Sequence, residues 1–369
     1  MIFQTIKNSI FKLFKSCDLQ ILTFSFILIF IGTAAIYSAS SLDPTKTLLH
    51  IRNFSIAIFL MVLVSKIPIS LLLRLSIFVY FFGLLLLILV EFFGTNINGA
   101  KRWLDLGFFK LQPSELMKIG VPLLLAWLYE KFEGPKFSAL NLILGTVIIA
   151  VPLFFIVRQP DLGTSILIAS AGFFVLYLGG ISKKIILFLL FIFIVSGPII
   201  WTSLHDYQKE RVLILLDPSK DPRGAGYHTI QSSIAVGSGG ISGKGWTEGT
   251  QSHLDFLPET TTDFIFAVIG EEFGLLGCTT IIIFYLIIIG KGLSISLNAP
   301  SMFGRLVSAS FTFIIFIYVF VNMGMVIGIL PIVGIPLPLI SYGGSSAVSI
   351  MISLGVIMSI NNHRRLVPN

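Results

Sequence analysis

Charged residues are scarce in this sequence, because Asp, Glu, Lys and Arg together make up only 12% of its 369 residues. Soluble domains carry roughly 25% charged residues, so the composition excludes a water-soluble globular fold. Hydrophobic residues reach 55%, and Phe alone occurs 34 times. A chain this apolar needs the lipid bilayer as its solvent, and we expect an all-α polytopic membrane protein.

Cysteine is nearly absent, with only Cys17 and Cys278, both in or beside apolar runs. This excludes a disulfide framework, and the sequence has no residue spacing typical of a metal site. The net charge of +7 comes from basic residues scattered singly or in pairs between apolar runs. Such scattering is typical of membrane topology signals, so we do not expect nucleic-acid binding. The first apolar run is too long for a cleavable signal peptide.

Apolar runs close to the roughly 20 residues that a spanning helix needs predict ten spans in one membrane domain covering residues 1–369. They lie at about 19–39, 51–66, 71–93, 113–131, 138–157, 161–180, 184–203, 263–289, 305–328 and 338–360. The second run is short. A large loop at about 204–262, between the seventh and eighth spans, is polar and glycine-rich, which predicts an ordered cap rather than a linker.

One set of short connections between these runs is consistently basic, which predicts that this side faces the cytoplasm. Its residues are Lys7, Lys12, Lys15, Lys66, Arg74, Lys131, Lys136, Lys183, Lys184, Lys291, Arg305, Arg364 and Arg365. An even number of spans puts both termini on that side. We therefore expect a multi-pass inner-membrane protein with cytoplasmic termini and with the segments 94–112 and 204–262 outside.

The first polar segment on the outer side leads into the fourth predicted span. Pro113 suits the first helical turn, which places Glu115 and Lys118 at i and i+3 on one helix face. Charges inside a span mark function by default, and the alternative is a structural ion pair. The preceding Arg102 and Trp103 fit either an interfacial anchor or an anion site.

A second polar segment is the tight turn between the fifth and sixth predicted spans. Arg158 and Asp161 flank Pro160 there, at adjacent helix ends. A structural salt bridge between them and a functional role are both open. Asp161 also complements the positive end of the helix that follows.

A third segment opens the eighth span. Thr262 is expected to cap this helix, with Asp263 in its first turn. Asp263 is either a partner of the helix dipole or a general base whose pKa is raised by desolvation. Glu271 and Glu272 are expected about 12–14 Å deeper, near the midplane. A transporter would use such a pair as a proton relay.

A fourth segment, residues 334–346, enters the last span and holds two prolines and paired glycines. This composition predicts a broken or re-entrant helix. Irregular backbone at membrane depth is tolerated only where it lines a cavity or is buried in protein, while small residues also serve helix packing. Both interpretations stay open.

These segments together resemble the SEDS family, named for shape, elongation, division and sporulation, and within it the RodA group more than the FtsW group. The resemblance covers the whole chain. The motifs that carry it are His205-Asp206-Tyr207, Glu210-Arg211-Val212, Leu216-Asp217-Pro218, Gly224-Ala225-Gly226-Tyr227, Gln231-Ser232, Gly249-Thr250-Gln251-Ser252, Phe256-Leu257-Pro258-Glu259 and Thr262-Asp263-Phe264.

The resemblance implies a peptidoglycan glycosyltransferase that polymerises lipid II at the periplasmic face during cell elongation and rod-shape maintenance. It implies that Asp263 is the essential aspartate and that other family positions line an outer cavity. Those positions are Arg102, Trp103, Glu115, Lys118, Arg158 and Asp161. The implied partners are a class B penicillin-binding protein, which cross-links the glycan, and the MreB, MreC and MreD proteins of the elongation machinery.

One departure from the family is the pair Thr260-Thr261, where members often have Arg-His. Because Thr262-Asp263-Phe264 is intact, we expect those two positions to lie outside the chemistry.

The expected reaction is an inverting displacement, with Asp263 as base and with Arg102 and Lys118 stabilising the leaving pyrophosphate. Arg158 is a less firm third cation, and Glu115 would orient Lys118. The sequence does not establish a cofactor, and it leaves open a divalent cation, Mg²⁺ or Mn²⁺, that shares the pyrophosphate charge, with Asp263 as its ligand instead of a base. The alternatives are a flippase for lipid-linked precursors and a noncatalytic scaffold for the penicillin-binding protein.

Overall fold

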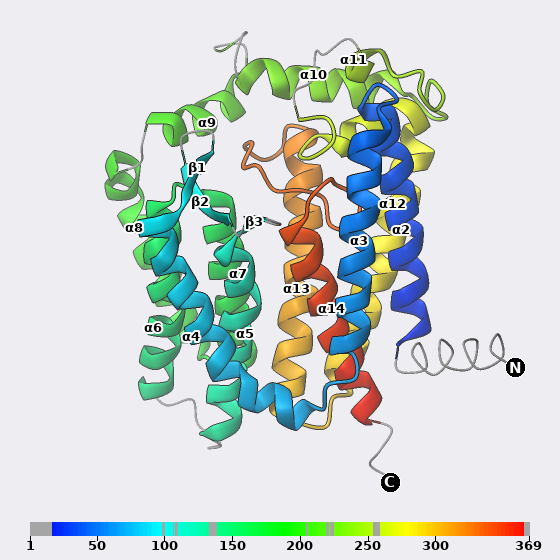
Figure 1. Cartoon of the computed structure of the whole chain (residues 1–369). Helices are drawn as coiled ribbons and strands as arrows, with labels where there is room; N and C mark the ends of the chain where they lie inside the picture. The colour runs from blue at the N-terminus through cyan, green and yellow to red at the C-terminus, as the bar shows by residue number, and fades with distance from the viewer. Residues whose placement is uncertain are drawn as a thin grey trace, which may run out of the picture.

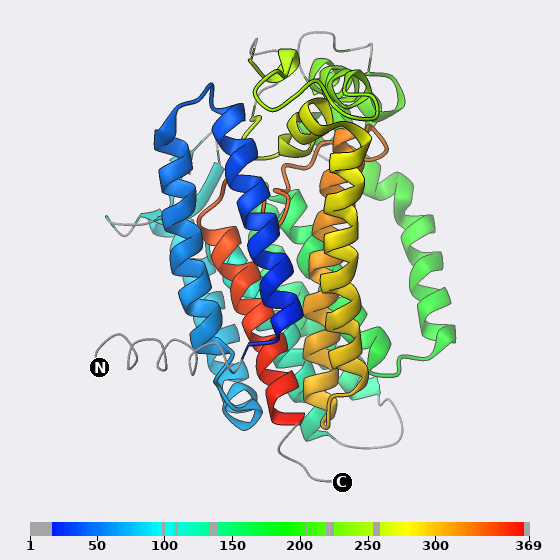
Figure 2. The same cartoon turned by 90° about the vertical axis from the view of Figure 1, so that its right-hand side faces the viewer.

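The computed structural model describes residues 17–97, 100–105, 107, 110–132, 139–203, 206–218, 221, 225–253 and 259–364. Long helices run side by side in this part of the chain, and short helices lie across one end of the bundle (Figures 1 and 2). Several residues of the predicted topology and motifs lie outside the described ranges. They are Lys7, Lys12, Lys15, Lys136, Arg365, His205, Gly224 and residues 256–258.

A helix is found at each of the ten ranges predicted to span the membrane. These helices are α2 (Leu19–Ala39), α3 (Pro44–Val64), α4 (Ile69–Phe93), α5 (Pro113–Lys131), α6 (Ala139–Arg158), α7 (Leu162–Leu178), α8 (Lys183–Ser203), α12 (Ile265–Leu297), α13 (Met302–Val326) and α14 (Ser345–Arg364). Among the described residues, seven helices are long and apolar enough to cross a membrane, and α7 is apolar but shorter. The predominantly helical membrane fold is confirmed, whereas the count of ten spans stays a prediction.

Two helix boundaries differ from the predicted ones for local reasons. The second span was expected from residue 51, but α3 begins at Pro44, because the side chain of Asp43 accepts a hydrogen bond from the Thr45 backbone N–H at 2.9 Å. The last span was expected from residue 338, but α14 begins at Ser345. The backbone from 331 to 344 is irregular, as the prolines and glycines of this segment predicted.

A small antiparallel sheet joins α4 to α5, which the all-α expectation missed. Its strands β1 (Thr95–Ile97), β2 (Ala100–Asp105) and β3 (Lys110–Leu111) pair in the order β1-β2-β3. Because β2 pairs on both edges, it holds Arg102 and Trp103 at the same end of the bundle as the short helices (Figure 1).

The short helices come from the chain between α8 and α12. They are α9 (Asp206–Leu216), α10 (Ala225–Ser238) and α11 (Thr250–His253), and they lie across the end of the bundle opposite the start of α2 and the end of α14 (Figure 1). Ser232 of α10 donates a hydrogen bond to the Val326 carbonyl at the end of α13, at 2.9 Å. The segment is therefore ordered and packed onto the bundle where the structure describes it.

Helix α12 is interrupted at Gly274, whose φ of 63° and ψ of −158° are not helical. A Cβ at this position would lie 2.4 Å from the backbone nitrogen of Gly243, so only glycine fits. The interruption separates residues 265–273 from residues 275–297, and the second section alone is long enough to span the hydrocarbon core. The first section belongs to the end of the bundle where α10 and α11 lie.

Candidate active site

Glu115 and Lys118 form a buried ion pair inside α5, at 2.7 Å, as their i,i+3 spacing predicted. Lys118 also donates to the hydroxyl of Tyr318 on α13, and Ser349 of α14 donates to Glu115 Oε2 at 2.6 Å. Lys118 is 3% exposed and Glu115 is 7% exposed. The pair therefore links three helices and faces protein groups rather than an open cavity.

Arg102 holds the turn between α6 and α7. Its guanidinium donates from Nε to the Gln159 carbonyl at 2.9 Å and from Nη2 to the Pro160 carbonyl at 2.6 Å. Arg102 is only half-buried, so a strand of the small sheet fixes the turn while leaving part of the cation accessible. Trp103, the next residue of β2, is also half-buried.

Of the two alternatives left open for Arg158 and Asp161, the salt bridge is not formed in the structure. Asp161 instead caps α7 by accepting from the Thr164 backbone N–H at 3.1 Å, and it accepts from Gln112 Nε2 at 3.1 Å. Arg158 is exposed and lies over the Phe154 ring, 4.9 Å from its centroid. The cap confirms that Asp161 complements the N-terminus of α7. The Arg158 guanidinium takes no part in this cap.

Asp263 lies just before α12, in a short irregular segment that is tied down through its backbone. Asn322 Nδ2 donates to the Asp263 carbonyl at 2.9 Å, and Ser341 Oγ donates to the Thr262 carbonyl at 2.6 Å. The Tyr342 backbone N–H donates to the Thr261 carbonyl at 2.8 Å. These bonds join the mouth of α12 to α13 and to the irregular segment before α14.

The expected helix cap at Thr262 was wrong. The residue at the N-cap position of α12 is Phe264, which makes no side-chain capping bond. Thr262 Oγ1 instead donates to Glu259 Oε2 at 2.8 Å. Asp263 is therefore not a first-turn residue, so the helix dipole does not account for its presence.

The surroundings of the Asp263 side chain raise its pKa, so they favour the protonated carboxyl group. Burial raises its pKa to about 6, and the negative charge of Glu259 adds to this, while the Arg211 guanidinium of α9 opposes it. Gly334 lies against the carboxylate, since a Cβ built there would be 3.4 Å from Asp263 Oδ2, and Gly334 itself is exposed. A carboxylate with this pKa is suited to general base catalysis near neutral pH.

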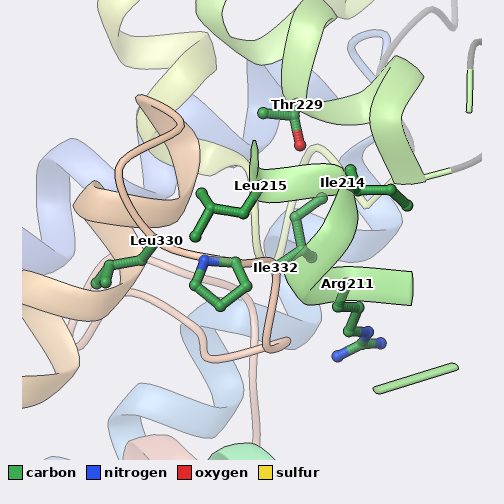
Figure 3. A pocket seen from close by; sticks show the side chains of 7 residues that line it. Arg211, Ile214, Leu215, Thr229, Leu330 and Ile332 are labelled. Atoms are coloured by element: carbon green, nitrogen blue, oxygen red, sulfur yellow. The ribbon is translucent and has the colours of Figure 1, made fainter. Parts of the chain in front are cut away.

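A small pocket lies between helices α9 and α10 on one side and residues 330–332 on the other (Figure 3). Arg211, Ile214 and Leu215 of α9 and Thr229 of α10 line one side, and Leu330, Pro331 and Ile332 line the other. The lining is apolar except for Thr229 and the one guanidinium. The charge of Arg211 also acts on Asp263, so a cation that lines this pocket influences the candidate base.

The backbone of residues 333–335 separates Asp263 from the start of α7. Gly163 of α7 packs so closely against this segment that a Cβ there would lie 2.9 Å from the Val333 carbonyl oxygen. On the other side of the segment, Gly334 faces Asp263. Of the predicted site residues, Arg102 and Asp161 therefore meet at the α6–α7 turn, Glu115 pairs with Lys118, and Asp263 lies across residues 333–335 from the turn.

Several residues around the site escaped the sequence reasoning. Arg211 appeared only inside a family motif, and Gln112, Tyr318, Asn322 and Ser349 are single polar residues in or next to apolar helices. A polar side chain inside an apolar run is the one signal that marks them, and it does not say which partner each one meets.

The predicted midplane position of Glu271 and Glu272 was wrong. Glu272 accepts a hydrogen bond from Ser38, the penultimate residue of α2, so both carboxylates lie at the end of the bundle, beside the break at Gly274. Glu271 accepts from Lys244 Nζ at 2.6 Å and from the Thr250 backbone N–H at 2.9 Å. The pair anchors the segment between α10 and α11, and the observation that favoured a proton-relay transporter is lost.

We expect the variant Glu271→Ala to lower the free energy of unfolding by about 2–3 kcal/mol, because it leaves several donors of the 244–251 segment without their acceptor. The midpoint of thermal unfolding in detergent measures this. Lys291→Ala is the control, since it breaks another ion pair, to Asp18 at 3.2 Å, without removing an acceptor of the 244–251 segment. Equal losses in the two variants would contradict the anchoring role.

A metal centre built by the protein alone is not visible, since the described part of the chain holds no group of three or more His, Cys, Asp or Glu side chains placed to bind a metal ion.

The comparisons with known proteins agree on one family. A sequence model described as cell cycle protein, which covers FtsW, RodA and SpoVE, matches residues 16–366. The chain is 46% identical over 332 residues to the peptidoglycan glycosyltransferase MrdB of Escherichia coli, covering 90% of each chain. It is 36% identical over 369 residues to the protein of the same name in Helicobacter pylori, covering 97% of this chain and 93% of that one.

Two solved structures share the fold. One is a chain of a peptidoglycan synthase complex, described for its structural coordination of polymerization and crosslinking, with a TM-score of 0.83 and 29% identity. The other is a mutant of the rod shape determining protein RodA of Thermus thermophilus, with a TM-score of 0.73 and 25% identity. Each match covers 94% of this chain and 98% of the other.

Proposed function

This chain belongs to the cell cycle protein family of FtsW, RodA and SpoVE, and from that membership we propose that it is a peptidoglycan glycosyltransferase of the inner membrane, acting in cell elongation and cell shape. Its substrate is lipid II, from which it builds glycan strands on the periplasmic face. The observation that carries the proposal is the carboxylate of Asp263, with its raised pKa, which is influenced by the charge of Arg211, a residue that lines the pocket.

The reaction requires a base at the acceptor sugar and positive charge at the leaving group. The acceptor hydroxyl attacks the anomeric carbon of lipid II, its proton passes to Asp263, and the bond to the pyrophosphate oxygen breaks with its electron pair leaving on the lipid pyrophosphate. The configuration at that carbon inverts in this single displacement. Asp263 is ionised at neutral pH and therefore able to accept the proton, because its pKa is about 6.

The leaving pyrophosphate is stabilised by the cations of the same end of the bundle. Arg102 keeps part of its guanidinium accessible while it holds the α6–α7 turn, and Arg211 adds a second cation whose charge reaches Asp263. Lys118, the other cation expected here, is paired with Glu115, so a direct contact with the substrate requires that this pair opens.

A divalent cation fits the same place without a site made by protein alone. Asp263 and Glu259 act on one another electrostatically, and Mg²⁺ is usually held by one or two carboxylates together with substrate phosphates. When bound, Mg²⁺ or Mn²⁺ would neutralise charge on the pyrophosphate.

Orientation and partners follow from the same membership. The start of α2 and the end of α14 lie opposite α9, α10 and α11 (Figure 1), and we place that end and both termini in the cytoplasm, with ten spans between them. The similar chain in a peptidoglycan synthase complex supports a class B penicillin-binding protein as partner. The link to MreB, MreC and MreD rests on the family resemblance.

The decisive experiment is polymerisation of lipid II by the purified protein in detergent, with the products separated by length. We expect glycan strands from the wild type. A flippase makes no glycan in this assay and needs vesicles with two sides, and a scaffold makes glycan only when an active partner is added. Absence of polymer both alone and with the penicillin-binding protein would overturn the proposal.

A further inference from the structure

Asn322 lies near the end of α13 and is fully buried. Its side-chain nitrogen Nδ2 donates two hydrogen bonds, one to the Asp263 carbonyl at 2.9 Å and one to the Ile335 carbonyl at 2.7 Å. Both acceptors are backbone oxygens from segments distant in the sequence. The neutral side chain of Asn322 therefore joins Asp263, the residue proposed as base, to the irregular segment 333–335.

The orientation of the amide is fixed by its partners. A carbonyl oxygen accepts hydrogen bonds and cannot donate one, so the atom that faces both the Asp263 and the Ile335 carbonyls must be the NH₂ group. Asn322 Oδ1 has no hydrogen-bond partner among the described residues although it is buried. An unpaired buried oxygen costs free energy, so the two hydrogen bonds that Nδ2 donates hold the side chain in this orientation.

The two bonds set the distance between Asp263, at the start of α12, and Ile335. Ile335 follows Gly334, the residue whose backbone lies against the Asp263 carboxylate, with 3.4 Å from a Cβ position to Oδ2. Ser341, in the turn before α14, donates its hydrogen bond to the neighbouring Thr262 carbonyl instead. Among the described contacts, Asn322 is the group that bonds to Asp263 and to residue 335 at the same time.

We propose that Asn322 is a positioning residue for the reaction, which holds the Asp263 carboxylate against the irregular segment 333–335 and at a fixed distance from the acceptor hydroxyl. This inference rests on the proposed function, because it needs Asp263 to act as the base. It assigns to α13 a role in the chemistry that neither local sequence nor charge indicates.

The test compares Asn322→Leu, which has a similar size and no donor, with Asn322→Ser, whose hydroxyl can donate to only one of the two carbonyls. We expect Asn322→Leu to lower kcat by about 100-fold, because misplacement by about 1 Å can cost this much. KM for lipid II should change less than about twofold, and Asn322→Ser should fall between Asn322→Leu and the wild type.

The pH profile separates positioning from a general loss of structure. Without the bond from Asn322, residues 333–335 relax away from Asp263 and water reaches the carboxylate, so its pKa moves down towards the ordinary value. The charged groups facing it are Glu259 from its own segment and Arg211 from α9, and neither is altered. The acid limb of kcat should therefore move to lower pH in both variants.

The matched control is Asn361→Leu, at the opposite end of the bundle. Asn361 Nδ2 donates to Asp18 Oδ2 at 3.0 Å, so the same substitution there removes a comparable bond far from the site. We expect it to lower thermal stability while leaving kcat and the acid limb unchanged.

The possible failures are distinguishable. If the wild type makes no glycan, the proposed function itself fails, and if Asp263→Asn is fully active, the assignment of Asp263 as the base fails. If those two behave as proposed while Asn322→Ser, soluble and monodisperse, keeps the wild-type kcat and acid limb, the positioning role is overturned. A uniform drop in rate with an unshifted acid limb in both variants also overturns it.

Discussion

Replacement of Asp263 by asparagine abolishes glycan synthesis and makes the protein more stable at neutral pH. The amide cannot take the proton from the acceptor hydroxyl, and loss of a general base costs about 10²- to 10⁴-fold in rate. The side chain keeps its size, so the bonds from Asn322, Ser341 and Tyr342 to the backbone of this segment are unaffected. Initial rates with lipid II measure the first effect.

The gain in stability follows from the sign of the pKa shift. Burial raises the pKa of Asp263 from 3.8 to about 6, so between these values the folded protein binds more protons than the unfolded chain. The contribution of Asp263 to stability is therefore greatest below about pH 4 and falls by about 3 kcal/mol as the pH rises through 6. Asp263→Asn lacks this loss.

Thermal unfolding at several pH values checks this expectation. The midpoint of Asp263→Asn should exceed that of the wild type above about pH 6, and the two should converge below about pH 4. A variant less stable than the wild type at neutral pH would show that the ionised carboxylate stabilises the fold, and its role would then be structural.

The second large effect is expected at Lys118, where Lys118→Met lowers the free energy of unfolding by about 3–5 kcal/mol. The substitution leaves Glu115 as a buried charge that keeps only the hydrogen bond from Ser349 among the described residues, and removal of one member of a buried pair is costly for this reason. The midpoint of thermal unfolding in detergent, followed by tryptophan fluorescence, measures the loss.

The double variant Glu115→Gln with Lys118→Met separates the two contributions. It removes both charges, so we expect it to recover at least half of the lost stability, since neutral replacements of a buried pair are often tolerated. Should the double variant be as unstable as Lys118→Met alone, the cost would come from the lost bond to Tyr318 rather than from the unpaired carboxylate.

The sequence predicts those parts of the site that depend on short-range geometry. The pairing of Glu115 with Lys118 follows from one helical turn, and the irregular backbone before α14 follows from Pro336, Pro338 and the paired glycines. The same reasoning did not decide between the alternatives at Arg158 and Asp161, because nearness in sequence favoured a salt bridge while the backbone N–H of Thr164 competed for the carboxylate.

The rest depends on contacts that a single sequence does not contain. Asn322 is 59 residues from Asp263, and nothing near either residue marks the bond between them. Glu271 and Glu272 were misplaced because a continuous helix was assumed, whereas Gly274 needs a non-helical backbone only because Gly243 comes close to it in space. The strands of the small sheet were missed because they are short and pair only with each other.

The most direct test of Asp263 as the base is the pH dependence of the initial rate of glycan synthesis by the purified wild type, over a range in which its thermal midpoint shows it to be folded. The base must be ionised to act, so the rate should be half-maximal near pH 6 and should fall about tenfold for each further pH unit below it. A rate at about pH 5 equal to that at neutral pH would contradict the assignment of Asp263.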